Sequence, residues 1–156
     1  MSTRGRRAPR PRESHGSLGP SESPGFLLWR ATLRWQRTVA AALRPLRLTH
    51  VQFVLLACTW WLTQVAGERP TQRRLADFAA TDPMMTSQVI RVLEARGLVR
   101  RAADPHDSRA LQLTATGAGA RLAREAIKVV EAADAEFFTA AVKVESMLPL
   151  LRSLAG

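Results

Sequence analysis

The chain has 156 residues, 46% of them apolar, so it is long enough for one domain with a full hydrophobic core and too apolar to stay unfolded throughout. Its 23 Lys and Arg residues outnumber the 13 Asp and Glu residues, and this excess of positive charge favours a polyanionic partner, with nucleic acid as the first candidate. The single cysteine, Cys58, excludes an internal disulfide, and the chain opens with no signal-peptide pattern, so we expect a cytoplasmic location.

The first part of the chain changes character near residue 25. Residues 1–25 are rich in Arg, Pro and Ser with almost nothing apolar to bury, which predicts a disordered tail. From Phe26 to about Arg44, apolar residues recur every three or four positions, as on one face of a helix. Pro45 is expected to end this helix.

A second helix should follow at once. Thr49 and Gln52 have the spacing of a capping box just before the apolar run "VQFVLLACTWWLTQVA". This run is interrupted by polar residues and falls short of the ~20 apolar residues of a membrane span, so no membrane is expected as partner. Because the helix is apolar on almost all sides, it should be enclosed by other elements or by a second subunit.

Two short helices and a tight turn come next. Thr71 is a suitable N-cap for a helix to about Ala80. Asp82 then caps a second helix with Pro83 in its first position, and Gly97 is placed to end it. The segment "PMMTSQVIRVLEAR" is therefore predicted to be a helix of nearly four turns.

The remainder reads as a hairpin and two helices. "LVRRA" and "ALQLT" are short strand patterns around a loop that contains Asp104 and Pro105. Thr114 is expected to cap a long helix through about Ala140, and a last helix should cover residues 145–154. Pro149 should either kink this last helix or start a new first turn.

This order of elements is typical of a winged helix-turn-helix: a mainly α fold with a small β-hairpin wing, whose second helix enters the major groove of double-stranded DNA. Thr86, Ser87 and Gln88 lie near the start of that helix, where short polar side chains reach base edges. Gln88 suits adenine, and Arg91, one turn further, suits guanine or phosphate. The basic residues around the unit are expected to contact the DNA backbone: Arg73, Arg74, Arg96, Arg100 and Arg101.

The segments "TDPMMTSQVIRVLEARGLVRR" and "DPHDSRALQLTATG" resemble the recognition helix and wing of the MarR family of bacterial transcriptional regulators. The matching features are Leu93-Glu94, Gly97-Leu98 and Asp107-Ser108-Arg109, in the family's order and spacing, and the likeness is strongest over residues 49–122. The resemblance implies that Arg109 inserts into the minor groove and that Asp107 braces the hairpin.

The resemblance also implies a homodimer on a pseudo-palindromic operator, most simply a repressor, and a small aromatic effector. Met84 and Met85 add flexible side chains near the groove, with Met85 counted among the recognition residues, so the operator cannot be derived from pairing rules. The implied organisation is a tail (1–25), an N-terminal dimerisation helix (26–48), the DNA-binding domain (49–114) and C-terminal dimerisation helices (115–156).

Other candidate sites receive simpler interpretations. Cys58 lies on an apolar stripe and is expected to be a buried small residue, not a redox sensor. Trp60 and Trp61 could line an effector pocket, although adjacent residues point about 100° apart on a helix, so at most one should face it. The histidines show no metal-ligand spacing, so neither a metal nor another cofactor is expected.

Two other classes of function are alternatives to DNA binding. An enzyme is not expected, because the chain has no glycine-rich phosphate loop and no nucleophile with a base at interpretable spacing. A winged-helix module that binds other proteins, without sequence-specific DNA binding, is the alternative. Steep loss of DNA affinity with added salt would distinguish the two.

Overall fold

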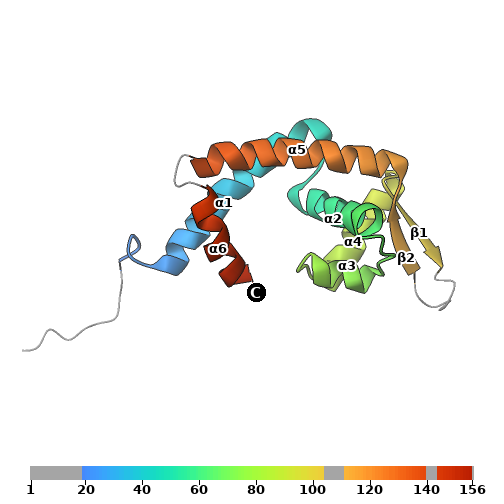
Figure 1. Cartoon of the computed structure of the whole chain (residues 1–156), viewed down its shortest axis with the longest axis horizontal. Helices are drawn as coiled ribbons and strands as arrows, with labels where there is room; N and C mark the ends of the chain where they lie inside the picture. Colours follow the sequence, from blue (N-terminus) through green and yellow to red (C-terminus); the bar gives the residue numbers. More distant parts are fainter. Residues whose placement is uncertain (1–18, 104–110, 140–143, 156) are drawn as a thin grey trace, which may run out of the picture. The chain divides into compact units, whose positions relative to one another are not determined.

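The computed structural model describes residues 19–103, 111–139 and 144–155 of the chain (Figure 1). It divides into two units, Met1–Thr32 and Leu33–Gly156, with the division inside the first helix. In chain order the elements are α1 (Pro24–Leu43), the 3-10 turn η1 (Arg44–Leu46), α2 (His50–Trp60), the π-helical turn η2 (Trp61–Val65), α3 (Gln72–Phe78), α4 (Pro83–Ala95), β1 (Val99–Ala103), β2 (Leu111–Ala115), α5 (Gly117–Thr139) and α6 (Val144–Ala155).

The first helix starts earlier than its apolar pattern predicts, at Pro24 and not at Phe26. Ser23 accepts a hydrogen bond from the Phe26 amide at 3.4 Å, and a proline is well suited to the first helical position because its φ is already helical. Part of the expected tail is therefore helix, while residues 1–18 lie outside the described residues.

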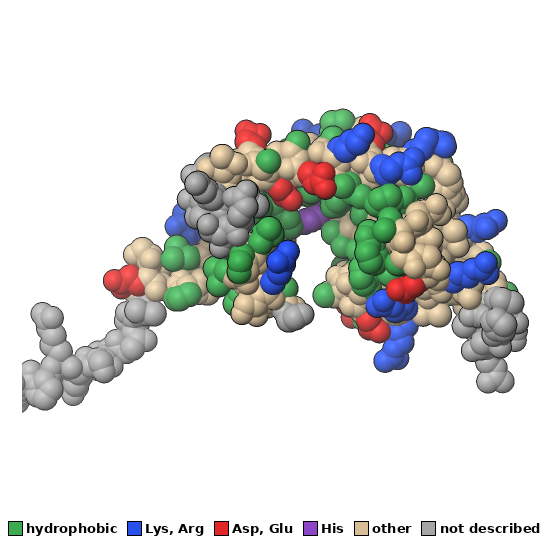
Figure 2. Space-filling model, in the orientation of Figure 1, with side chains coloured by type: hydrophobic (Ala, Val, Ile, Leu, Met, Phe, Trp, Pro, Cys, Tyr) green, Lys and Arg blue, Asp and Glu red, His purple; other side chains and the backbone are tan. Residues whose placement is uncertain are grey.

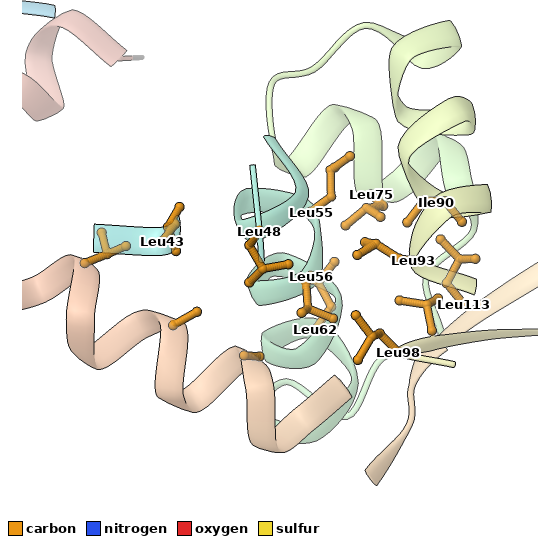
Figure 3. Close-up of a cluster of buried hydrophobic side chains, with 14 of the residues drawn as sticks. Leu43, Leu48, Leu55, Leu56, Leu62, Leu75, Ile90, Leu93, Leu98 and Leu113 are labelled. Atoms are coloured by element: carbon orange, nitrogen blue, oxygen red, sulfur yellow. The ribbon is translucent and has the colours of Figure 1, made fainter. Parts of the chain in front are cut away.

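The core lies where α2 meets α3, α4, α5 and β2 (Figures 1 and 3). The capping box at the start of α2 is confirmed, since the Thr49 hydroxyl and the Gln52 side chain each accept a hydrogen bond from the other residue's amide. The prediction that other elements enclose α2 is also confirmed by its contacts with these neighbours. The largest buried side chains are Leu43, Leu55, Leu56, Leu62, Leu75, Ile90, Leu93 and Leu113.

Both ends of α4 follow the sequence signals. Asp82 Oδ1 accepts hydrogen bonds from the amides of Met84 and Met85, each at 2.9 Å. At the other end Gly97 has φ +68°, its amide donates to the carbonyl of Glu94, and the amide of Leu98 donates to that of Leu93. This pair of bonds is a Schellman motif, and its left-handed residue is one that glycine adopts without strain.

The hairpin is antiparallel, with Val99 paired to Ala115 and Ala103 to Leu111. It is attached to α3, because the Leu113 amide donates to the Pro70 carbonyl at 2.8 Å and an isolated bridge joins Thr71 to Gln112. These bonds place the hairpin against the start of α3 and beside the end of α4. The order of helices and strands predicted for residues 49–115 is confirmed.

Two expectations for the C-terminal part need correction. Thr114 does not cap α5, since it lies in β2 opposite Arg100. The cap is Thr116, whose hydroxyl accepts a hydrogen bond from the Gly119 amide at 3.0 Å and donates one to the Gly97 carbonyl at 2.7 Å. Pro149 lies inside α6, which continues through it, so no new helix starts there.

No single helix within the described ranges is long and apolar enough to cross a membrane. The segments Pro24–Leu46 and His50–Val65 reach the required length and composition only when taken together, and they are bent by 73° at their junction.

Candidate nucleic-acid interface

The outer face of α4 carries a stripe of solvent-facing side chains at helical spacing. Met84, Ser87, Gln88 and Arg91 follow one another at intervals that put them on the same side of the helix. Gln88 and Arg91 are exposed, Ser87 is half-buried, and Met84 is 72% exposed. Because Ile90 faces the core, the stripe points away from it. We call these four residues the α4 stripe.

Thr86 does not belong to this surface, contrary to the sequence-based expectation. Its side chain is fully buried, and its hydroxyl lies 2.8 Å from the Asp82 carbonyl and 2.8 Å from the Thr81 hydroxyl. Thr86 therefore connects α4 to the turn before it and is not available to a base edge. A threonine in a helix commonly donates to the carbonyl four residues before it, and the spacing of Thr86 from Asp82 was the signal available in the sequence.

Met84 and Met85 differ in their exposure and in their position relative to the α4 stripe. Met85 is 37% exposed and lies to one side of the α4 stripe, whereas Met84 is 72% exposed and lies on it. The spacing of Met84 to Ser87, Gln88 and Arg91 was the signal that could have identified it. Met84 is therefore the functional candidate that the sequence reasoning left out.

Several arginines lie around the α4 stripe, and only some of their side chains are exposed without a partner. Arg73 and Arg100 are exposed, like Arg91, and the side chains of these three form no hydrogen bond or ion pair with any described residue. Figure 2 shows Lys and Arg side chains gathered over α3, α4, the hairpin and the adjoining end of α5. Arg73 and Arg100 therefore have the exposed guanidinium groups that the predicted phosphate contacts require.

The remaining three predicted backbone contacts are engaged within the protein. Arg74 donates from Nε and Nη2 to the Glu68 carboxylate, both at 3.2 Å, and lies 5.4 Å from the centre of the Phe78 ring. Arg96 donates to the Arg47 carbonyl at 2.9 Å. Both side chains thus have partners within the protein, and their expected contact with the DNA backbone stays a prediction.

Arg101 lies on the inner face of the hairpin. Its Nε is 3.3 Å from Glu94 Oε2, and its side chain is only 21% exposed. Strand alternation explains this, since Arg101 shares a face with the buried Val99 while Arg100 points the other way. Arg101 therefore ties β1 to α4 through this ion pair, and its expected contact with the DNA backbone stays a prediction.

The wing residues Asp107 and Arg109 lie outside the described residues, so their expected roles are untested.

A hollow of about 580 Å³ lies between α1, the start of α2 and the turn that joins α3 to α4. Trp60 and Trp61, which were expected at an effector pocket, are not among the described residues that line it. Trp60 packs against the core, and Trp61 stacks on Phe78 with 5.5 Å between ring centres. The lining residues are Gln36, Ala40, Thr49, His50, Val51, Val54, Ala79 and Thr81.

His50 is the ionisable residue of this hollow. Its ring packs edge-on against Trp35 at 5.0 Å between centres, and the Trp35 indole donates to Asp134 Oδ1 at 2.7 Å. Burial lowers the pKa of His50, and the negative charge of Asp134 opposes this to a smaller extent. The imidazole is therefore mainly neutral near pH 7.

Cys58 is half-buried, and burial raises the pKa of its thiol. Because the thiolate is the reactive form, this thiol has little nucleophilic character. In the described part of the chain no group of three or more His, Cys, Asp or Glu side chains is arranged to hold a metal ion.

Comparison with known proteins agrees with this arrangement. Residues 48–111 match the model of the MarR family. The chain is 46% identical over 137 residues to YdcH, an HTH-type transcriptional regulator of Bacillus subtilis, covering 87% of this chain and 92% of that protein. It is 40% identical over 111 residues to Rv2887, an HTH-type transcriptional repressor of Mycobacterium tuberculosis, covering 71% and 76% of the two chains.

Solved structures show the same fold. The crystal structure of CouR from Rhodococcus jostii, bound to p-coumaroyl-CoA, has a TM-score of 0.75 and 32% identity, with 89% of this chain and 96% of that one covered. The structure of Rv2887 in complex with salicylic acid has a TM-score of 0.63 and 34% identity over 85% and 94% of the two chains. The chain therefore belongs to the MarR family and is a winged helix-turn-helix transcriptional regulator.

Proposed function

We propose that this regulator is a homodimeric repressor that binds a pseudo-palindromic operator and is released by a small aromatic ligand. The observation that carries the DNA-binding part is the α4 stripe, with Gln88 and Arg91 exposed on a helix whose opposite side is buried. Its N-terminal end also carries the positive end of the helix dipole toward the DNA. The proposal includes no catalytic role and places the protein in the cytoplasm.

Specificity and affinity come from different side chains. Gln88 pairs with adenine and Arg91 with guanine or phosphate, while Arg73 and Arg100 neutralise backbone phosphates on either side. Ser87 adds a short hydroxyl, and Met84 and Met85 supply apolar contact. Arg109 enters the minor groove and Asp107 braces the wing, as the family resemblance implies.

The dimer rests on the terminal helices. In α6 the side chains of Leu148, Leu150, Leu151 and Leu154 are between 40% and 66% exposed, an apolar surface that a monomer would leave in water. A second copy is the occupant that the MarR family resemblance implies, and a two-fold dimer places two α4 helices about one DNA turn apart.

The ligand would occupy the hollow beside His50. Its volume is in the range of small-molecule sites, and its walls mix apolar groups with a few polar ones. CouR and Rv2887 were crystallised with p-coumaroyl-CoA and salicylic acid, which supports an aromatic ligand here as well.

A ligand in this hollow would act on DNA binding through the turn before α4. Thr81 lines the hollow, and its hydroxyl is 2.8 Å from that of Thr86, which is anchored in α4. A molecule that prefers one position of Thr81 would shift α4 with it, because a ligand favours whichever conformation it binds more tightly.

The test is selection of genomic DNA fragments by the purified full chain, repeated with salicylic acid and with p-coumaroyl-CoA. We expect enrichment of a two-fold site with half-sites about 10 bp apart, binding that weakens steeply with added salt, and release by one of the ligands. Failure to enrich any sequence would instead support a protein-binding module. Enrichment without release would retain the repressor and remove the ligand from the proposal.

A further inference from the structure

The side chain of Met84 is the apolar one on the α4 stripe, and solvent reaches it freely before DNA is bound. Met84 is 72% exposed, the largest value among the exposed large apolar residues described, and it lies on the α4 stripe. An apolar side chain that stays in water does not stabilise the free protein, because the favourable free energy of its transfer out of water is not realised. Exposure also gives small polar reagents direct access to the thioether.

The other described sulfur atoms are less accessible. Cys58 is half-buried, and its raised pKa keeps it in the thiol form, which reacts slowly with oxidants. Met85 is 37% exposed, about half the value of its neighbour, and Met147 in α6 is partly buried. A reagent that attacks sulfur from solvent therefore meets Met84 first among these residues.

We propose that Met84 is an oxidation site through which peroxides or hypohalous acids lower the DNA affinity of this regulator. With hydrogen peroxide, the thioether sulfur attacks one peroxide oxygen, the S–O bond forms as the O–O bond breaks, and the departing hydroxide takes the remaining proton to leave as water. Sulfur loses two electrons and the peroxide gains them. The product is methionine sulfoxide, which methionine sulfoxide reductases convert back.

The new oxygen weakens binding for an electrostatic reason. A sulfoxide oxygen is a hydrogen-bond acceptor, and it would face a DNA surface whose phosphates are negatively charged acceptors. The apolar contact of the unmodified thioether with a thymine methyl or a sugar is lost at the same time. The cap of α4 does not depend on the side chain, since Asp82 binds the amides of Met84 and Met85.

This inference rests on the proposed DNA binding, so the experiment measures affinity before and after oxidation in each protein. The full chain in a Cys58→Ala background is treated with hydrogen peroxide, sulfoxide at each methionine is quantified by mass spectrometry, and affinity for the selected operator duplex is measured by fluorescence anisotropy. We expect sulfoxide to form fastest at Met84 and affinity to fall about five-fold or more, roughly the loss of one good contact. A methionine sulfoxide reductase should restore it.

Two variants assign the effect to one residue. Met84→Leu should bring the ratio of affinities before and after oxidation much closer to one, with any remainder due to Met85, whereas Met147→Leu should keep the ratio of the parent protein. An unchanged affinity with Met84 fully oxidised would overturn the proposal, as would an equal loss in Met84→Leu. If the untreated chain binds no DNA, the proposed function itself fails, and this outcome is distinct from both of the others.

Discussion

At the scale of single residues, folding changes the ionisation of His50 by lowering its pKa. His50 lies at the start of α2, where burial against Trp35 lowers its pKa below the usual 6.5 and Asp134 opposes the shift to a smaller extent. The folded state therefore holds fewer protons on this ring than the unfolded state does. The free energy of unfolding must rise with pH in the interval between the two pKa values.

This relation gives a testable pH dependence. The stability contribution of neutral His50 should be present above pH 6.5 and should be lost as the pH falls through the unfolded pKa toward the folded one. Thermal unfolding at pH 7.5 and 5.5 should show a larger decrease in Tm for the parent protein than for His50→Gln, which has no ionisable group at this position. Equal decreases would mean that His50 is not desolvated as described.

Some side chains have the exposure that the sequence predicts, and others do not. Helical spacing correctly placed Gln88 and Arg91 outward, but Thr86 was expected there and is buried by a hydrogen bond to the turn. Arg101 was expected outside and is paired with Glu94. In both cases the spacing carried the signal, because Thr86 lies four residues before the buried Ile90 and Arg101 lies two residues after the buried Val99.

At the scale of elements, the close approach of α5 to the segment between α4 and β1 depends on a glycine. A Cβ added at Gly119 would lie 1.9 Å from the carbonyl oxygen of Leu98, which already accepts a hydrogen bond from the Thr116 amide. Backbone atoms on both sides leave no flexible side chain to move aside. The packing of α5 against the segment that joins α4 to the hairpin therefore requires glycine at position 119.

Gly119→Ala should accordingly destabilise the protein by more than about 2 kcal/mol, because α5 must move away from the Leu98 backbone to admit one methyl group. Gly117→Ala is the matched control in the same helix, since its Cβ would meet only the end of the Arg121 side chain at 3.7 Å. That change should be neutral or slightly stabilising, as alanine favours helix over glycine. Urea unfolding of both variants measures the difference, and similar midpoints would contradict the packing argument.

The ends of helices were predictable from the sequence where only one suitable capping residue was present. Thr49, Thr71, Asp82 and Gly97 were each identified from the sequence, and each cap is formed in the structure. Thr114 was chosen as the cap of α5 because it follows an apolar strand pattern, but strand pairing continues past it and Thr116 takes the role. With two threonines so close together, pairing across the hairpin decides between them, and this is not a local property.

At the scale of the whole molecule, the apolar surface of α6 determines what the protein does in solution. Leu150 and Leu154 are 60% and 66% exposed and lie one turn apart, so they form a continuous apolar patch on the helix. A second copy that covers this patch would bury both side chains. The proposed dimer would therefore stabilise the folded protein by covering this patch, in addition to matching the symmetry of the operator.

Leu150→Glu should convert the dimer into a monomer, because an unpaired carboxylate would be buried at the contact. Arg152→Glu introduces a carboxylate two residues away, on the opposite side of α6, and should leave the dimer intact. Light scattering gives the mass of each variant. A dimer that survives Leu150→Glu would remove α6 from the interface.

The attachment of the hairpin to α3 has a further consequence for solubility. Because β2 is bonded to Pro70 and bridged to Thr71, among the described residues the free row of strand amides and carbonyls belongs to β1. A free strand edge can pair with strands of other chains and so begin aggregation, which charged side chains counteract. Arg100 stands on β1 as an exposed charge. The side chain proposed to contact phosphate thus also keeps copies of the protein apart when they are not bound to DNA.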